Sequence, residues 1–193
     1  GEIADQVLLA QNDMGRRVTN IVGMGQGEPF LNYRNVLAAL RILNDPQGLA
    51  IGARHISIST CGVIEGIERF SHEPKQFTLA VSLHAARQST RDLLMPRVAR
   101  YKLPDLKQAL MRYVKRTNRR VTLEYIMIDN VNDTDRDLEA LNAFCSDLLC
   151  HVNLIPINAV EGSPFQPSDP LVLDQWVQSI QSHGKEATVR DSR

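Results

Sequence analysis

The chain has 193 residues, enough for one hydrophobic core or a large part of one. Hydrophobic residues make up 43% and charged residues 23%, a balance that excludes a disordered or fibrous chain. The formal net charge is zero, so global charge does not indicate a nucleic-acid partner. No apolar run approaches the roughly 20 residues that span a bilayer, which excludes a transmembrane helix.

Short apolar runs alternate with longer amphipathic ones along the whole chain. The first segment resembles an amphipathic helix already under way, without a cap, so we expect the chain to begin inside a larger protein. The predicted strands cover residues 20–24, 55–60, 77–83, 121–128, 152–157 and 187–190. These runs are mostly continuous rather than alternating, which is typical of parallel strands covered on both faces.

Helical periodicity fills the intervals between these strands. The predicted helices cover residues 1–13, 32–44, 62–71, 103–118, 134–148 and 170–182. The pairs Asp133-Thr134 and Ser168-Asp169 place capping residues at the start of two of them. Alternating strands and helices predict an α/β fold with a parallel sheet, either doubly wound or a barrel. Without a low-complexity tract or a break in composition, we expect a single domain over residues 1–193.

The three cysteines are Cys61, Cys145 and Cys150. An odd number at irregular spacing argues against a disulfide framework and favours a reducing, cytoplasmic location. No CxxC, CxxxCxxC or HExxH pattern is present, so spacing alone predicts no metal site. Core packing is the favoured interpretation of Cys145 and Cys150, and an inert buried thiol that of Cys61.

The residues that directly follow the predicted strands are the strongest functional signal. In α/β sheets and barrels, ligands bind at the carboxyl ends of the strands. Most of these positions carry small or polar residues where a core would favour apolar ones. The segments are residues 25–29 (GQGEP), 59–62 (STCG), 82–84 (SLH), 129–130 (DN) and 156–158 (PIN).

Each of these residues has both a functional and a structural interpretation. Glycines after a strand allow close approach to a ligand, and Glu28 can pair with an ammonium group, but the same turn can simply cap a helix. Ser59 and Ser82 can bind a ribose or carboxylate, or act as caps. His84 can be an acid, a base, a ligand contact or a structural residue, and Asn158 is equally ambiguous.

Taken together, the motifs resemble the radical S-adenosylmethionine methylases that modify an adenine of large-subunit ribosomal RNA (RlmN/Cfr-like). Order and spacing agree across nearly the whole chain, and five collinear motifs are far more specific than any one. Gln26 stands where the family usually has methionine. The matching segments are residues 24–32 (MGQGEPFLN), 58–63 (ISTCGV), 81–85 (VSLHA) with 91–96 (RDLLMP), 121–125 (VTLEY) with 131–133 (VND), and 153–158 (NLIPIN).

The resemblance implies a partial (β/α)6 radical-SAM-type barrel, truncated at both ends, that holds S-adenosylmethionine at its mouth. Gly27 and Glu28 would contact the methionine end of this cofactor. The other cofactor-binding residues that the resemblance implies are Ser59, Ser82, Leu83, His84 and Asn158.

The family's chemistry needs groups that this sequence lacks. A CxxxCxxC loop holds a [4Fe–4S] cluster, and a cysteine near the C-terminus carries the methyl group; none of the three cysteines matches either role. We therefore expect no catalytic residue and no metal ligand in this chain, which would be inactive alone. The first barrel strand is also expected to lie outside it, leaving a sheet edge that invites self-association.

The implied activity belongs to a full-length parent. That enzyme would methylate an adenine of ribosomal RNA, at carbon 2 in preference to carbon 8, with transfer RNA as a further substrate and an external electron donor. One alternative is another radical S-adenosylmethionine enzyme, such as a glycyl-radical activating enzyme. The other is a non-catalytic α/β module that binds nucleotides or RNA.

Overall fold

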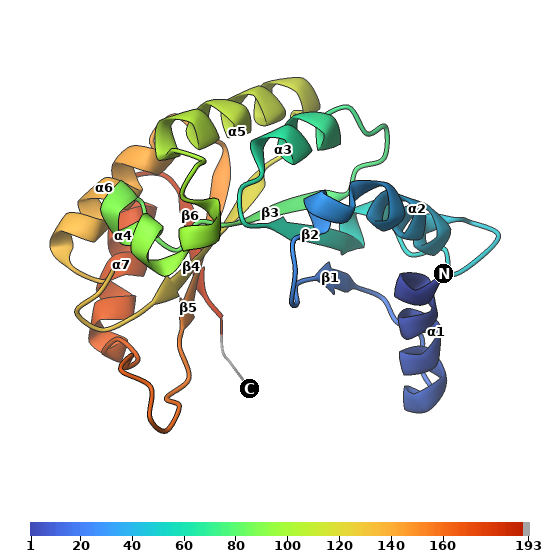
Figure 1. Ribbon diagram of the computed structural model, residues 1–193, viewed down its shortest axis with the longest axis horizontal. Helices are drawn as coiled ribbons and strands as arrows, with labels where there is room; N and C mark the ends of the chain where they lie inside the picture. Colours follow the sequence, from blue (N-terminus) through green and yellow to red (C-terminus); the bar gives the residue numbers. More distant parts are fainter. Residues whose placement is uncertain (191–193) are drawn as a thin grey trace.

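The structure, a computed structural model, describes residues 1–190 (Figure 1). Within these residues, six parallel strands form one sheet, and their spatial order follows the chain. All the predicted strands are confirmed, each end to within two residues. The strands are β1 (Ile21–Gly23), β2 (Ile56–Thr60), β3 (Thr78–Ser82), β4 (Val121–Met127), β5 (Cys150–Pro156) and β6 (Glu186–Val189).

Helices connect the strands, and the six predicted ones are confirmed. The structure adds α4, which is short and buries Thr90 and Arg91 rather than an apolar stripe, so periodicity gave no signal for it. The helices are α1 (Glu2–Met14), α2 (Tyr33–Asn44), α3 (Ile64–Phe70), α4 (Gln88–Leu94), α5 (Leu103–Thr117), α6 (Asp135–Cys145) and α7 (Pro170–Ser182). Short 3-10 helices are η1 (Pro29–Asn32), η2 (Ala53–His55) and η3 (Pro96–Val98).

The two predicted caps are present. The Thr134 side chain accepts a hydrogen bond from the backbone N–H of Asp137, and that of Asp169 accepts one from Leu171. None of the helices in residues 1–190 is long and apolar enough to span a membrane.

The consecutive strand order decides between the two predicted architectures. A doubly wound sheet reverses its strand order at a switch point, whereas this sheet has no reversal among residues 1–190. Because parallel crossovers are right-handed, consecutive order places the connecting helices on the same face of the sheet. Figure 1 shows the sheet curving, with α3 and α5 on its outer side and α1 near the β1 edge. The fold is therefore a partial barrel.

The expectation that the strands are covered on both faces is only partly met, because helices cover the outer face of the described sheet alone. In β5, Val152 and Leu154 are fully buried, whereas the alternating residues His151 and Asn153 are only partly buried. Since side chains alternate between faces, the outer face is apolar and the inner, concave face carries polar groups. The alternation is visible in the sequence of β5, but the abundance of aliphatic residues obscured it.

The outer face of the sheet and the helices enclose one hydrophobic core. Phe70 packs between Phe30 and Tyr113, and Tyr125 packs against Trp176. Cys145 and Cys150 are free thiols buried in this core, as the packing interpretation predicted.

The contact between α3 and η1 is too close at Gly66 to accommodate a side chain. A Cβ atom built there would lie 2.4 Å from ring atoms of Phe30. We expect Gly66→Ala to lower the free energy of unfolding by about 2 kcal/mol, because Phe30 would have to move. Urea denaturation of the chain and the variant measures this change.

Gly48→Ala is the matched control, since its Cβ would make only ordinary contacts, the nearest at 3.5 Å. Its unfolding free energy should stay within about 0.5 kcal/mol of that of the unchanged chain. Equal stability of the two variants would contradict the assigned packing of α3 on η1.

Candidate functional site

A cavity of about 140 Å³ lies at the carboxyl end of the sheet. Five of the seven predicted site residues line it: Gly27, Glu28, Ser59, Ser82 and His84. The other lining residues are Gly23, Met24, Gly25, Pro29, Thr60, Cys61, Glu124 and Ile155. The structure thus brings together residues from β1 to β5 and the turns that follow these strands.

Two predicted residues do not line this cavity. The side chain of Leu83 is fully buried in the hydrophobic core. Asn158 lies in the exposed loop that follows β5.

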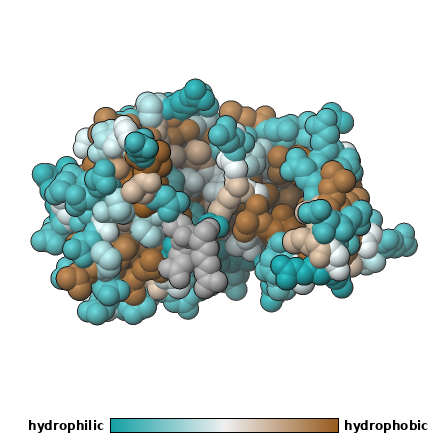
Figure 2. All heavy atoms as spheres, turned by 90° about the horizontal axis from the view of Figure 1, so that it is seen from below, coloured by the Kyte–Doolittle hydropathy of each residue, from teal (hydrophilic) through white to brown (hydrophobic). Residues whose placement is uncertain are grey.

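The cavity is smaller than the roughly 300–1,000 Å³ of ordinary small-molecule sites. Six residues of the turn 23–29 line both this cavity and a groove of about 640 Å³ beside α1. The cavity is therefore the enclosed end of a larger depression. Figure 2, which looks onto the open side of the sheet, shows a hollow between the two halves of the molecule.

Glu28 connects the turn after β1 to the end of β2. Its Oε1 accepts hydrogen bonds from the Phe30 N–H (2.9 Å) and from the Thr60 hydroxyl (2.8 Å). Its Oε2 accepts one from the Cys61 N–H (2.7 Å). A carboxylate offers about four acceptor positions, so three are already used by the protein. Before it, Gly27 adopts a φ of +97°, which favours glycine.

The end of β2 is also held from the other side, by Arg91. The Arg91 Nη2 donates to the Cys61 carbonyl at 2.7 Å, and the side chain of this arginine is fully buried. Burial, and then the nearby Glu28 carboxylate, raise the pKa of the Cys61 thiol. Because the thiolate is the reactive form, the raised pKa fits the inert thiol predicted for Cys61, but the predicted burial is wrong, since the residue is only partly buried.

A row of polar side chains crosses the concave face beside the cavity. Ser82 on β3, Glu124 on β4, Asn153 on β5 and Thr188 on β6 are aligned by strand register. The Asn153 Nδ2 donates to the Glu124 Oε1 at 3.3 Å, and the Thr188 hydroxyl donates to the Asn153 Oδ1 at 2.5 Å. Ser59 extends the row, its hydroxyl lying 3.4 Å from that of Ser82.

Sequence reasoning did not single out Glu124. The available signal was a carboxylate in the middle of an apolar strand, VTLEYIM. A buried charged residue in a strand is rare unless it is paired or functional.

His84 is held in one orientation by β4. Its backbone is left-handed, with a φ of 56°, and its N–H donates to the Glu124 carbonyl. The ring Nδ1 accepts a hydrogen bond from the Ile126 N–H at 3.2 Å. Burial, together with the charge of Arg91, lowers the pKa of His84 to about 4. The ring is therefore neutral at physiological pH and carries its proton on Nε2, so it is a hydrogen-bond donor.

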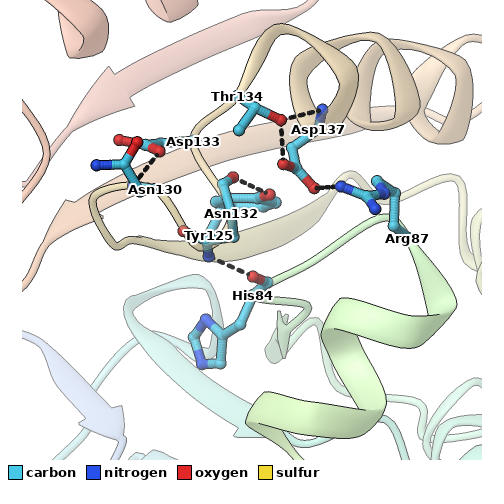
Figure 3. A network of polar contacts seen from close by, with 8 residues as sticks. All are labelled: His84, Arg87, Tyr125, Asn130, Asn132, Asp133, Thr134 and Asp137. Carbon is cyan, nitrogen blue, oxygen red and sulfur yellow. Dashed lines mark hydrogen bonds and ion pairs between the residues drawn. The ribbon is translucent and has the colours of Figure 1, made fainter. Parts of the chain in front are cut away.

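A buried network supports this histidine from behind (Figure 3). Asn132 donates to the carbonyls of His84 (2.7 Å) and Ile126 (2.6 Å), and its own carbonyl accepts from the Tyr125 hydroxyl. Figure 3 shows the His84 ring pointing away from this network. The motif at residues 131–133 is thus a support for His84.

A second part of the network fixes the start of α6. The buried Asp137 carboxylate accepts from Arg87 at 3.2 Å and from the Thr134 hydroxyl at 2.5 Å. Asn132 in the loop between β4 and α6, and Asp137 in the first turn of α6, are thereby anchored against the segment that follows β3.

Residues 1–190 contain no group of three or more His, Cys, Asp or Glu side chains arranged to hold a metal ion.

The state of His84 predicts how stability depends on pH. The unfolded chain protonates this ring near pH 6.5, whereas the folded chain keeps it neutral down to about pH 4. The contribution of the neutral ring to the free energy of unfolding is therefore complete above pH 6.5. This contribution, about 3 kcal/mol, is lost as the pH falls toward 4. His84→Asn, which tolerates the left-handed backbone, should remove this part of the slope.

Urea denaturation at several pH values between 4 and 7 measures the effect in the chain and in His84→Asn. Carboxylates titrate in both proteins, so the difference between the two curves isolates His84. Parallel curves would show that the ring is not held neutral.

A scan against protein-family models finds no match. Among curated proteins, several relatives carry the name "Probable dual-specificity RNA methyltransferase RlmN". The one from Alkaliphilus metalliredigens is 43% identical over 190 residues, which are 98% of this chain and 54% of the relative. The one from Moorella thermoacetica is 46% identical over 185 residues, which are 96% of this chain and 52% of the relative.

Solved structures give a similar picture. The crystal structure of a radical SAM methyltransferase from Sphaerobacter thermophilus has a TM-score of 0.95 and 44% identity, and covers 100% of this chain and 57% of its own. A domain of pyruvate-formate lyase-activating enzyme from Bacteroides vulgatus has a TM-score of 0.64. At 16% identity, over 90% of this chain and 100% of that one, it shows a shared fold alone.

This chain spans about half the length of the curated relatives it matches, and the similarity extends over nearly all of it. The strand-end motifs, the partial parallel barrel and these relatives agree. The chain belongs to the radical SAM methyltransferase family that includes the RlmN-type RNA methyltransferases.

Proposed function

We propose that this chain is the S-adenosylmethionine-binding core of a radical SAM RNA methyltransferase. One observation carries the proposal: five of the seven residues implied by the resemblance line the same cavity. They come from three motifs far apart in the sequence. A chance distribution of small and polar residues would not gather them at one edge of the sheet.

The chemistry of the cavity suits this cofactor. In the proposal, the Gly27 backbone and the remaining acceptor position of Glu28 contact the methionine end. The hydroxyls of Ser59 and Ser82 and the N–H of the neutral His84 ring offer partners for the rest of the molecule. Leu83 and Asn158 stay in the proposal on the resemblance alone, because neither side chain lines the cavity.

The cysteines of this chain do not fit the family's [4Fe–4S] cluster. Cys145 and Cys150 lie in the outer hydrophobic core, whereas Cys61 is in the cavity wall. Cluster ligands are therefore expected from a CxxxCxxC loop in a longer protein, and the isolated chain is proposed to be inactive. The role of these residues is to bind and orient the cofactor and to exclude water from it.

The proposed substrate of the full-length parent is an adenine of large-subunit ribosomal RNA, methylated at carbon 2 in preference to carbon 8. Transfer RNA is the second proposed substrate, as the term "dual-specificity" in the relatives' name suggests. The parent would act in the cytoplasm with an external electron donor. For the isolated chain we propose self-association through β1, whose Val22 side chain is exposed.

Calorimetric titration with S-adenosylhomocysteine tests cofactor binding. We expect the chain to bind this stable analogue, and the double variant Ser59→Ala/Ser82→Ala to bind at least about tenfold more weakly, since two polar contacts are lost. Ser146→Ala, on the outer surface at the end of α6, is the control. Absence of binding, or equal affinity of all three proteins, would contradict the proposal.

Anaerobic reconstitution with iron and sulfide tests whether the chain can hold a cluster. We expect no stable iron–sulfur absorbance, because residues 1–190 contain no suitable ligand group. A relative that contains CxxxCxxC is the positive control. A cluster that survives gel filtration on this chain would overturn the assignment of its ligands to another segment.

A further inference from the structure

Glu124 is the one buried acid of the cavity whose carboxylate is incompletely paired within residues 1–190. Its residue exposure is 3%, and its Oε2 has no hydrogen-bond partner among the described residues. Its Oε1 receives a single, long hydrogen bond from Asn153. Asp137, which is equally buried, shows the usual arrangement, since Arg87 and Thr134 both donate to its carboxylate.

An unpaired carboxylate oxygen inside a protein is costly unless something supplies a donor. Glu124 lines the same cavity as Ser59, Ser82 and His84. Strand register places Ser82 next to it on one side and Asn153 on the other. The protein side of Glu124 is thus occupied, so the missing donor is expected from a molecule in the cavity.

We propose that the Glu124 carboxylate binds the ribose hydroxyl groups of the nucleoside that occupies this cavity. This inference rests on the proposed function, which puts the methionine end of the cofactor at Gly27 and Glu28, in the turn after β1. Glu124 lies within β4, three strands away from β1 in the sheet. The donors that follow the methionine end along the cofactor are the two ribose hydroxyls.

The alternative donor is the ammonium group of the cofactor. A buried ammonium would add a second charge to be desolvated, whereas a hydroxyl is a neutral donor. Ser59 and Ser82, beside Glu124, are also better matched to hydroxyl groups, to which they can both donate and accept hydrogen bonds.

The energetics of the folded chain support a binding role. Burial raises the pKa of Glu124, and the hydrogen bond from Asn153 and the charges of Arg190 and His151 oppose this only in part. The ionised side chain therefore destabilises the folded state at neutral pH. A residue that is unfavourable for folding but lines a cavity is typical of a binding site.

The test compares the unchanged chain, Glu124→Gln and the exposed-surface control Glu139→Gln. Each is titrated with S-adenosylhomocysteine and with 5′-methylthioadenosine, which keeps the ribose and adenine but lacks the amino-acid end. We expect Glu124→Gln to weaken both ligands roughly 10- to 100-fold, while its melting temperature is equal or higher. Glu139→Gln should match the unchanged chain.

A second measurement tests the proposal even if Glu124→Gln fails to fold. The unchanged chain is titrated with 5′-methylthioadenosine and its 2′,3′-dideoxy form, and loss of the hydroxyls should weaken binding by a similar factor. In Glu124→Gln the same two ligands should differ much less, because the effects of contacting groups are not additive.

The outcomes separate the possibilities. Weakening of S-adenosylhomocysteine alone would assign Glu124 to the ammonium group and overturn the ribose assignment. Unchanged affinity for both ligands, or equal binding of the dideoxy form by the unchanged chain, would overturn it as well. If the unchanged chain binds neither ligand, the proposed function itself fails and this inference fails with it.

Discussion

The carboxylate of Glu28 joins two loops that no sheet hydrogen bond connects. It fixes the turn after β1 through Phe30 and the end of β2 through Thr60 and Cys61. The Thr60 hydroxyl in turn accepts hydrogen bonds from the N–H groups of Gly62 and Val63, just before α3, whose Gly66 packs against Phe30. One side chain therefore sets the wall of the cavity and the contact between η1 and α3. Charge-assisted hydrogen bonds of this kind are about twice as strong as neutral ones. This strength suits a side chain that holds both the cavity wall and the contact between η1 and α3.

Much of the fold could be predicted from the sequence because aliphatic runs and helical periodicity are local signals. The strands and the longer helices were located in this way, and the caps at Thr134 and Asp169 were identified correctly. The helix α4 was missed since it has no apolar stripe. The covering of only one face of the sheet was missed because it depends on strand order, which no local pattern encodes.

The gathering of Ser59, Ser82 and Glu28 at one edge was predictable, because the carboxyl ends of parallel strands lie together. Two properties of the site were not. The neutral state of His84 arises from burial and from the Ile126 N–H, which are contacts across strands. The importance of Glu124 lies in an oxygen without a partner among residues 1–190, and such an absence appears only when all its neighbours are placed.

The consecutive order of the strands also bears on how the chain folds. Each strand after β1 pairs with the strand before it in the sequence. Its partner has therefore already been synthesised when the strand itself is made. Loop closures are therefore limited to single strand–helix units, and the sheet can grow in one direction as the chain leaves the ribosome. The row from Ser82 to Thr188 is completed only when β6 docks on β5.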